Sequence, residues 1–281
     1  MINIALYSSF YNESTNVKEV VNSVLSQTLL PCIWVIADDG SQDDTLSLLK
    51  TITKDHKWIK LVSMPSKTEK NILTAGKAWK VALEVLSEQS PSYDYYCKLD
   101  GDIVLPSNYF QTISSFMIKN HEYRVTSGCV YIKNEGTWVY EGKGDLDEFV
   151  LNENPRGAGM MIDRDFFALV EISHFPITAP DDFFNAKALT KGFKVSQLNI
   201  PMYQLRDTSK PSPEKRGTVM KYFGASILHV LLLIPYMRLS LKEGYSLLKG
   251  YLNYRGVIVT DNDVRKFYSF KEVIKRHLFN V

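Results

Sequence analysis

The stretch Cys32–Ser41 reads CIWVIADDGS and sets a short apolar run directly before two aspartates and a glycine. Apolar runs of this length, bounded by polar turn residues, are typical of a strand buried in a sheet. We expect a helix to start near Ser41, because its hydroxyl can cap the first turn. Three similar runs predict further strands: Asn3–Ser8, Trp58–Ser63 and Tyr95–Leu99.

Helical patterns alternate with these four strands. Apolar residues recur at helical spacing over Val17–Leu25, over Leu46–Ile52 and within Ile72–Glu88. Such alternation indicates βαβ units, so we predict an α/β fold with a Rossmann-like, mostly parallel sheet covered by helices on both faces. Further strands at Val125–Ile132 and Thr137–Tyr140, joined by Gly- and Asn-rich connections, predict mixed pairing in the middle of the chain.

The last hundred residues change in character. They predict a helix over Asp181–Thr190, a strand from Lys194 to about Leu198 and a proline-containing, charged linker at Lys210–Arg216. Phe223–Met237 is mostly apolar but too short for a spanning helix, which needs about 20 residues. We therefore expect a buried or interfacial helix there.

Length, composition and charge restrict the class of protein. The 281 residues are 45% hydrophobic and 12% aromatic, which is enough for a substantial core and excludes overall disorder. Three scattered cysteines exclude a disulfide framework and a Cys-x-x-Cys zinc site, and no secretory signal is expected, so a cytoplasmic setting fits best. Residues 1–209 carry a net charge of −6 and residues 210–281 one of +8. Such a basic segment suits an anionic membrane, an acidic partner, nucleic acid or an ordinary solvated surface.

Carboxylates follow two of the predicted strands. Asp38 and Asp39 directly follow the second strand, and Asp100-Gly101-Asp102 follows the fourth. Ligands of open α/β sheets bind beyond the carboxyl ends of the strands, so both groups should face one crevice. Hard oxygen ligands suit Mg²⁺ or Mn²⁺, which can bridge the phosphates of a nucleotide. The alternative for Asp38-Asp39 is a turn that only starts a helix.

The Asp-x-Asp spacing alone is weak evidence. It also occurs at Asp145/Asp147, Asp163/Asp165 and Asp261/Asp263, in polar stretches where a solvated surface is the ordinary explanation. Another acidic pair, Asp181-Asp182, opens a predicted helix. The helix dipole favours carboxylates there, which fits either simple capping or an ionised general base.

In this order and context the motifs carry a resemblance. Ser9–Glu13, Val35–Ser41, Lys98–Asp102 and Pro180–Asp182 are similar to the family-two glycosyltransferases of GT-A fold, over roughly residues 1–205. The resemblance implies an inverting glycosyltransferase, of the hexosyltransferase kind. It would move a sugar from a UDP- or GDP-sugar to an acceptor hydroxyl or lipid phosphate, with Mg²⁺ or Mn²⁺ as cofactor.

The resemblance also implies roles for single residues. Asp39 would read the nucleotide base, Asp100 would contact the ribose, Asp102 would bind the metal and Asp182 would be the catalytic base. The full set expected to bind the nucleotide-sugar is Ser9, Tyr11, Glu13, Asp39, Lys77, Asp100, Gly101 and Asp102. Weaker candidates, for the acceptor or the diphosphate, are Arg156, Gly157, Asp181 and Arg206.

The chain departs from the family pattern at two places. Asp181-Asp182 stands where the family usually has Glu-Asp, and Arg206 lies where many members place a metal-binding histidine. Arg206 could contact the diphosphate itself, or the site could depend less on metal, and both readings stay open.

We expect a catalytic domain at 1–209, with a nucleotide-binding half at 1–102 and an acceptor-binding half at 103–209, followed by a basic helical tail at 210–281. Members that act on lipid-linked acceptors often have such tails, so membrane contact through residues 217–255 is expected, against packing on the catalytic domain or dimerisation. Nucleic acid is not an expected partner. A nucleotidyltransferase and a catalytically silent nucleotide-sugar-binding domain are the rival classes.

Overall fold

The computed structural model describes residues 2–65, 75–88, 93–151, 153–170, 178–206 and 212–279. Contacts divide the chain into two compact units. The first comprises Met1–Asp181 and Phe193–Asp207, and the second comprises Asp182–Gly192 and Thr208–Val281. The division at residue 209 that the sequence suggests stays a prediction.

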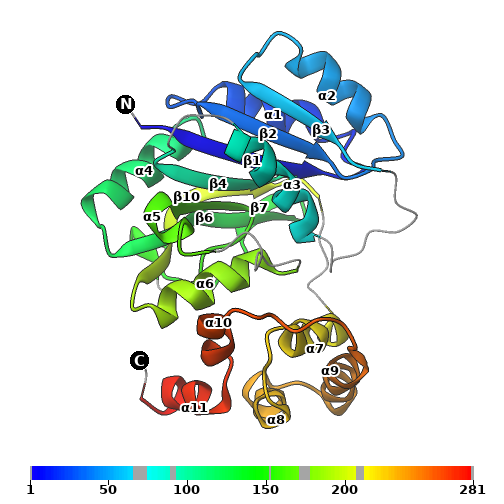
Figure 1. The fold of residues 1–281 in the computed structure, drawn as a ribbon, viewed down its shortest axis with the longest axis vertical. Helices are drawn as coiled ribbons and strands as arrows, with labels where there is room; N and C mark the ends of the chain where they lie inside the picture. Colours follow the sequence, from blue (N-terminus) through cyan, green and yellow to red (C-terminus); the bar gives the residue numbers. More distant parts are fainter. Residues whose placement is uncertain are drawn as a thin grey trace. The chain divides into compact units, whose positions relative to one another are not determined.

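The first unit is built on one mixed sheet in the order β3-β2-β1-β4-β9-β6-β10-β5 (Figure 1). Its first four strands are parallel and are β1 (Ile4–Phe10), β2 (Ile33–Asp38), β3 (Ile59–Ser63) and β4 (Tyr95–Asp100). The other strands are β5 (Ile103–Val104), β6 (Tyr123–Asn134), β7 (Thr137–Tyr140), β8 (Val150–Leu151), β9 (Gly159–Asp163) and β10 (Lys194–Gln204). Because β9 runs antiparallel between β4 and β6, the predicted mixed pairing is confirmed.

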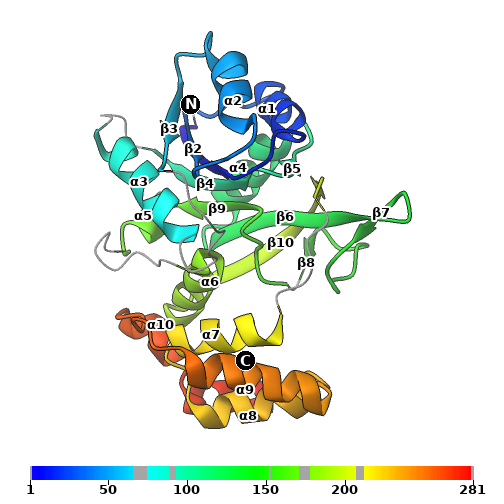
Figure 2. The same ribbon diagram turned by 90° about the vertical axis from the view of Figure 1, so that its right-hand side faces the viewer.

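Helices cover both faces of the parallel strands, as the sequence predicts. They are α1 (Val17–Leu25), α2 (Thr45–Thr53), α3 (Ala75–Glu88), α4 (Tyr109–Lys119) and α5 (Arg164–Phe167). Side chains of β1 alternate between the faces. Leu6 and Phe10 lie in the core cluster with Val20 of α1, whereas Tyr7 stacks on Trp79 of α3 with ring centroids 5.6 Å apart. Figure 2 shows α3 on the opposite side of the strands from α1.

The second unit is helical and contains the predicted C-terminal appendage. Its helices are α7 (Pro213–Tyr222), α8 (Ile227–Tyr236), α9 (Leu241–Asn253), α10 (Asn262–Phe267) and α11 (Phe270–Phe279), and α6 (Pro180–Thr190) enters it from Asp182. Met220, Val230 and Leu247 form the centre of its small core. None of the helices in the described ranges is long and apolar enough to span a membrane.

Local hydrogen bonding corrects two predicted helix starts. α2 begins at Thr45 rather than near Ser41, because the Ser41 hydroxyl accepts a hydrogen bond from Asn12 N (3.0 Å) instead of capping a helix. The apolar helix begins at Ile227, after a turn in which Gly224 has φ of +77°, and Ser226 caps it.

Other differences between the prediction and the structure concern where segments begin and end. The linker prediction is wrong for residues 213–216, which already belong to α7 behind the capping Ser212, while Lys210 and Pro211 lie outside the described residues. β10 continues to Gln204 instead of ending near Leu198. α4 and β9 were not expected from the sequence.

Candidate functional site

The carboxyl ends of β1, β2 and β4 bring the predicted acidic groups to one edge of the sheet. Phe10 of β1 pairs with Asp38, and its neighbour Ser9 pairs with Asp100. Gly101 lies so close to β1 that a Cβ atom there would meet Ser9 O at 2.7 Å. A glycine is therefore required for this approach, and the expected convergence of Asp38 and Asp100 is seen.

Asp38 and Asp39 have different environments. The Asp38 side chain is buried, and its Oδ2 accepts a hydrogen bond from Ser41 N (3.3 Å), so this residue forms the turn that the alternative interpretation describes. Its Oδ1 has no hydrogen-bond partner within the described part of the chain. Asp39 is half-buried, and its backbone N–H donates to Phe10 O (2.8 Å). This bond holds the loop after β2 against the end of β1.

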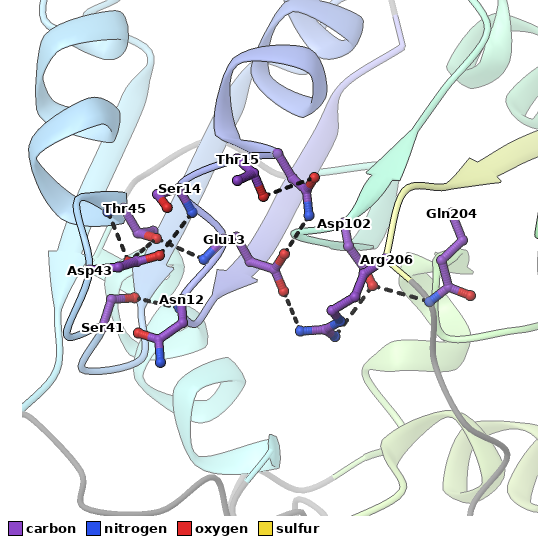
Figure 3. A network of polar contacts seen from close by, with 11 residues as sticks. Asn12, Glu13, Ser14, Thr15, Ser41, Asp43, Thr45, Asp102, Gln204 and Arg206 are labelled. Atoms are coloured by element: carbon purple, nitrogen blue, oxygen red, sulfur yellow. Dashed lines mark hydrogen bonds and ion pairs between the residues drawn. The ribbon is translucent and has the colours of Figure 1, made fainter. Parts of the chain in front are cut away.

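Hydrogen bonds tie the loop after β1 to the loop after β2 (Figure 3). Gln42 N donates to Asn12 Oδ1 (2.8 Å), and Ser14 N donates to Asp43 Oδ2 (3.1 Å). Glu13 N donates to the hydroxyl of Thr45 (2.8 Å). Tyr11 and Glu13, both predicted to bind the nucleotide-sugar, thus belong to a loop that several hydrogen bonds hold against the loop after β2.

Arg206 joins two acidic residues that lie far apart in the sequence. Its Nη1 contacts Glu13 Oε1 at 2.5 Å, and its Nη2 lies 3.3 Å from Asp102 Oδ2 (Figure 3). Gln204 Nε2 donates to the same Asp102 oxygen (3.1 Å), and Asn16 Nδ2 donates to Glu13 Oε2 (2.7 Å). Both carboxylates are almost fully buried. Burial and nearby Asp100 raise the pKa of Asp102, although Arg206 and Gln204 oppose the shift.

Lys98 forms a second charged cluster that sequence reasoning missed. Its ammonium contacts Asp100 Oδ1 and donates to Gly157 O (2.7 Å). Burial alone would lower the pKa of Lys98, but Asp100 and then Asp181 outweigh it and raise the pKa. The signal was present in the sequence, because residues 98 and 100 of one strand share a face.

The remaining candidates, among them the expected base Asp182, fall in different places. Gly157 lies beside this cluster, since a Cβ atom there would come within 3.3 Å of Asp181 Cβ. Arg156 instead lies 3.6 Å from Glu141 through its Nη2. Asp182 lies in the first turn of α6 and belongs to the second unit. Lys77 is in α3, but its side chain lies outside the described residues.

Two of the three other Asp-x-Asp pairs, Asp163/Asp165 and Asp261/Asp263, have structural roles, whereas Asp145 and Asp147 are exposed as expected. Asp163 caps α5 and contacts Arg124 Nη1 at 2.6 Å. Asp261 caps α10 and contacts Lys187 Nζ at 2.5 Å, with its side chain only 9% exposed. The expectation of a solvated surface is therefore wrong for Asp261, because a buried lysine neutralises it.

The side chains around Asp102 do not fit the expected Mg²⁺ or Mn²⁺. The Asp102 Oδ2 atom already accepts a hydrogen bond from Gln204 and forms an ion pair with Arg206, and a divalent ion on this carboxylate would lie beside the Arg206 guanidinium, a like charge. Over the described ranges, no three His, Cys, Asp or Glu side chains are grouped so that they could hold a metal.

Comparison with known proteins gives a family and a fold. The model of glycosyl transferase family 2 matches residues 8–175, more than half of the chain. No curated protein sequence matches.

Two solved structures illustrate the likeness in fold. S. aureus TarS 1–349 in complex with UDP-GlcNAc is 18% identical with a TM-score of 0.54, over 90% of this chain and 72% of that one. A mannosyltransferase from Pyrobaculum calidifontis in complex with GDP-Man and Mn²⁺ is 12% identical with a TM-score of 0.56, over 89% and 73%. At these identities the likeness shows a shared α/β fold with a mostly parallel sheet.

Proposed function

Because this chain belongs to glycosyl transferase family 2, we propose that it moves a sugar from a nucleoside-diphosphate sugar to an acceptor with inversion at the anomeric carbon. The observation that carries the proposal is the meeting of Ser9, Asp38 and Asp100 at one edge of the parallel strands. Family membership disfavours the rival nucleotidyltransferase. TarS with UDP-GlcNAc and the mannosyltransferase with GDP-Man support a UDP- or GDP-sugar as donor.

The proposed donor pocket uses the loops after β1, β2 and β4. The Asp39 carboxylate accepts a hydrogen bond from an N–H of the base, with Ser9 and Tyr11 beside it. Asp100 contacts the ribose. Lys77 is proposed to bind the diphosphate. The hydrogen bonds of residues 12–14 to the loop after β2 support such a pocket, because a loop that is already held in place loses little entropy on binding.

The chemical step needs one base and one leaving group. Asp182 takes the proton from the acceptor hydroxyl, and the acceptor oxygen forms a bond to the anomeric carbon from the side opposite the diphosphate. The bond between that carbon and the phosphate oxygen breaks, and its electron pair leaves with the nucleoside diphosphate. The side chains around Asp102 do not fit the Mg²⁺ or Mn²⁺ that the family resemblance expects there, so no step here runs through a metal ion.

We propose that residues 133–160 determine which acceptor binds.

The basic helical tail, residues 210–281, is proposed to contact a membrane. Exposed apolar side chains recur on one face of α8, at Leu228, Leu231, Leu232 and Tyr236. On α9, which packs against α8, Leu241 and Tyr245 are 94% and 70% exposed. Arg238, Lys242 and Lys249 lie on or between the same helices. Apolar and cationic side chains together suit a peripheral position on an anionic lipid surface.

Calorimetric titration with UDP and GDP tests the donor pocket. We expect one of the two to bind, and Asp39→Asn to weaken its binding by about tenfold or more, the loss of a charge-assisted hydrogen bond. Asp165→Asn, an exposed carboxylate in the same unit, should bind like the wild type. If neither nucleotide bound, the proposed function would be wrong.

Release of nucleoside diphosphate from UDP-GlcNAc or GDP-Man, with short glycosides as acceptors, tests the base. Asp182→Asn should lower this rate by about 10²–10⁴-fold while leaving donor binding intact. A variant that turned over at the normal rate would contradict the assignment of Asp182.

A further inference from the structure

We infer that Arg206 binds the donor diphosphate in the place where a metal ion was expected, so that transfer by this chain needs no divalent cation. The inference rests on the proposed function, since it concerns the same donor. It starts from the contacts of Arg206, which lies two residues after the end of β10, where the resemblance expects a histidine.

The guanidinium is fixed before any ligand arrives. Two almost fully buried carboxylates hold it, Glu13 from the loop after β1 and Asp102 from the loop after β4, and Asn16 and Gln204 hold these carboxylates in turn. Arginine normally loses much side-chain freedom when it binds an anion. Here the protein has already restricted that freedom, so a phosphate meets a preorganised donor.

The guanidinium also has N–H donors left for a ligand. It carries five N–H donors, and the two carboxylates use one on each terminal nitrogen, which leaves at most three for phosphate oxygens. The side chain remains 37% exposed, although both of its carboxylate partners are only 4% exposed. A planar group with several parallel donors is well suited to phosphate.

Charge argues against a metal in addition to Arg206. Each carboxylate of Asp100-Gly101-Asp102 already has a cationic partner, Lys98 for Asp100 and Arg206 for Asp102. These two side chains together bring the two positive charges that a divalent ion would supply. An ion on Asp102 would have to displace Arg206 and break the bridge to Glu13.

In the proposed reaction, Arg206 stabilises the negative charge of the leaving group. When the bond between the anomeric carbon and the phosphate oxygen breaks, negative charge grows on the departing diphosphate. Fixed N–H donors aimed at that charge lower the barrier, because they need no reorganisation as the charge appears.

The test measures binding and turnover with and without metal. Wild-type protein in EDTA should bind the preferred nucleoside diphosphate with an affinity within about twofold of that in Mn²⁺, and should release nucleoside diphosphate from its donor at a similar rate. Arg206→Gln should weaken diphosphate binding by about tenfold or more and lower turnover by about 10²–10³-fold, as for other lost transition-state donors. Binding of the parent nucleoside, which has no phosphate, should not change.

Two further variants separate this role from a purely structural one. Arg206→Lys keeps the charge and should recover part of the diphosphate affinity, and it also serves if Arg206→Gln fails to fold. Arg164→Gln, a surface arginine of the same unit paired with Asp165, should behave as the wild type.

Turnover that stops in EDTA and returns with Mn²⁺ would overturn the inference and leave the proposed function intact. Equal diphosphate affinity in wild type and Arg206→Gln would overturn it as well. A protein that bound no nucleoside diphosphate under any condition would overturn the proposed function, and this inference with it.

Discussion

Lys98 Nζ donates a hydrogen bond to the carbonyl oxygen of Gly157 at 2.7 Å, so that a lysine of β4 holds a loop 59 residues further along the chain. The same ammonium contacts Asp100 Oδ1 and lies in the field of Asp181. One side chain thereby connects the acidic end of β4 with the glycine loop before β9. Lys98 is therefore assigned a positioning role in the site.

Lys98→Met should weaken both the fold and the site. It removes the partner of Gly157 O and the cation between two carboxylates, which we expect to cost about 1–3 kcal/mol in the free energy of unfolding. Donor turnover should fall mainly through kcat if Lys98 orients the loop, and Lys98→Arg should restore part of it. Urea denaturation and steady-state kinetics measure both effects. Lys50→Met, on the exposed face of α2, is the control and should change neither.

Asp43 should make stability depend on pH in the acid range. Burial of its carboxyl raises the pKa, but hydrogen bonds from Thr45 and Ser14 together outweigh this and lower the pKa to about 2 from a usual 3.8. A carboxyl with a lowered pKa stabilises the fold fully above its unfolded-state pKa and loses this effect as the pH falls through about 2.

The matching variant is Asp43→Asn, followed by urea denaturation between pH 6 and pH 2.5. The difference in stability between wild type and variant should be largest near pH 6 and should shrink below about pH 4, where the wild-type carboxyl begins to lose its advantage. Asp55→Asn, on an exposed turn, supplies the comparison. A difference that stayed constant over this range would contradict the assigned role of Asp43.

Elements with a clear periodic pattern could be predicted from the sequence. β1 to β4 and the helices between them were, because alternating strands and amphipathic helices leave a direct pattern of apolar residues. β9 was not predicted, since Gly159–Asp163 is short and pairs antiparallel with strands that lie far from it in sequence. A single chain gives no signal for such pairing.

The same limit applies to the candidate site. The convergence of Asp38 and Asp100 followed from their places at strand ends. The contacts of Arg206 with Glu13 and Asp102 could not be predicted, because they depend on three loops and on the length of β10. Long-range ion pairs of this kind come from tertiary packing, which local patterns do not encode.

Gly250→Ala should separate α9 from α7 in the second unit. A Cβ atom at Gly250 would lie 1.9 Å from Glu214 O, a backbone atom that cannot rotate away. We expect a loss of about 1–3 kcal/mol or more, typical of an overpacked contact, visible in the unfolding of the helical unit. Gly244→Ala, on the same helix, meets only the side chain of Ile234 at 3.0 Å and should be tolerated far better. Thermal unfolding followed by circular dichroism compares the two variants, and equal melting temperatures would contradict this packing.

Membrane contact is tested by flotation with vesicles. The wild-type protein should float with vesicles that contain anionic phosphatidylglycerol and much less with neutral phosphatidylcholine, because the apolar side chains of α8 and α9 insert while nearby cations meet the headgroups.

Leu231→Ser with Leu241→Ser should abolish flotation without changing donor binding, since both side chains are already exposed. Leu30→Ser removes an exposed leucine from the first unit and should float normally. Raising the salt concentration separates the two contributions, because it weakens only the charge attraction. A protein that stayed at the bottom of the gradient with anionic vesicles would instead leave the apolar face of α8 and α9 to a protein partner.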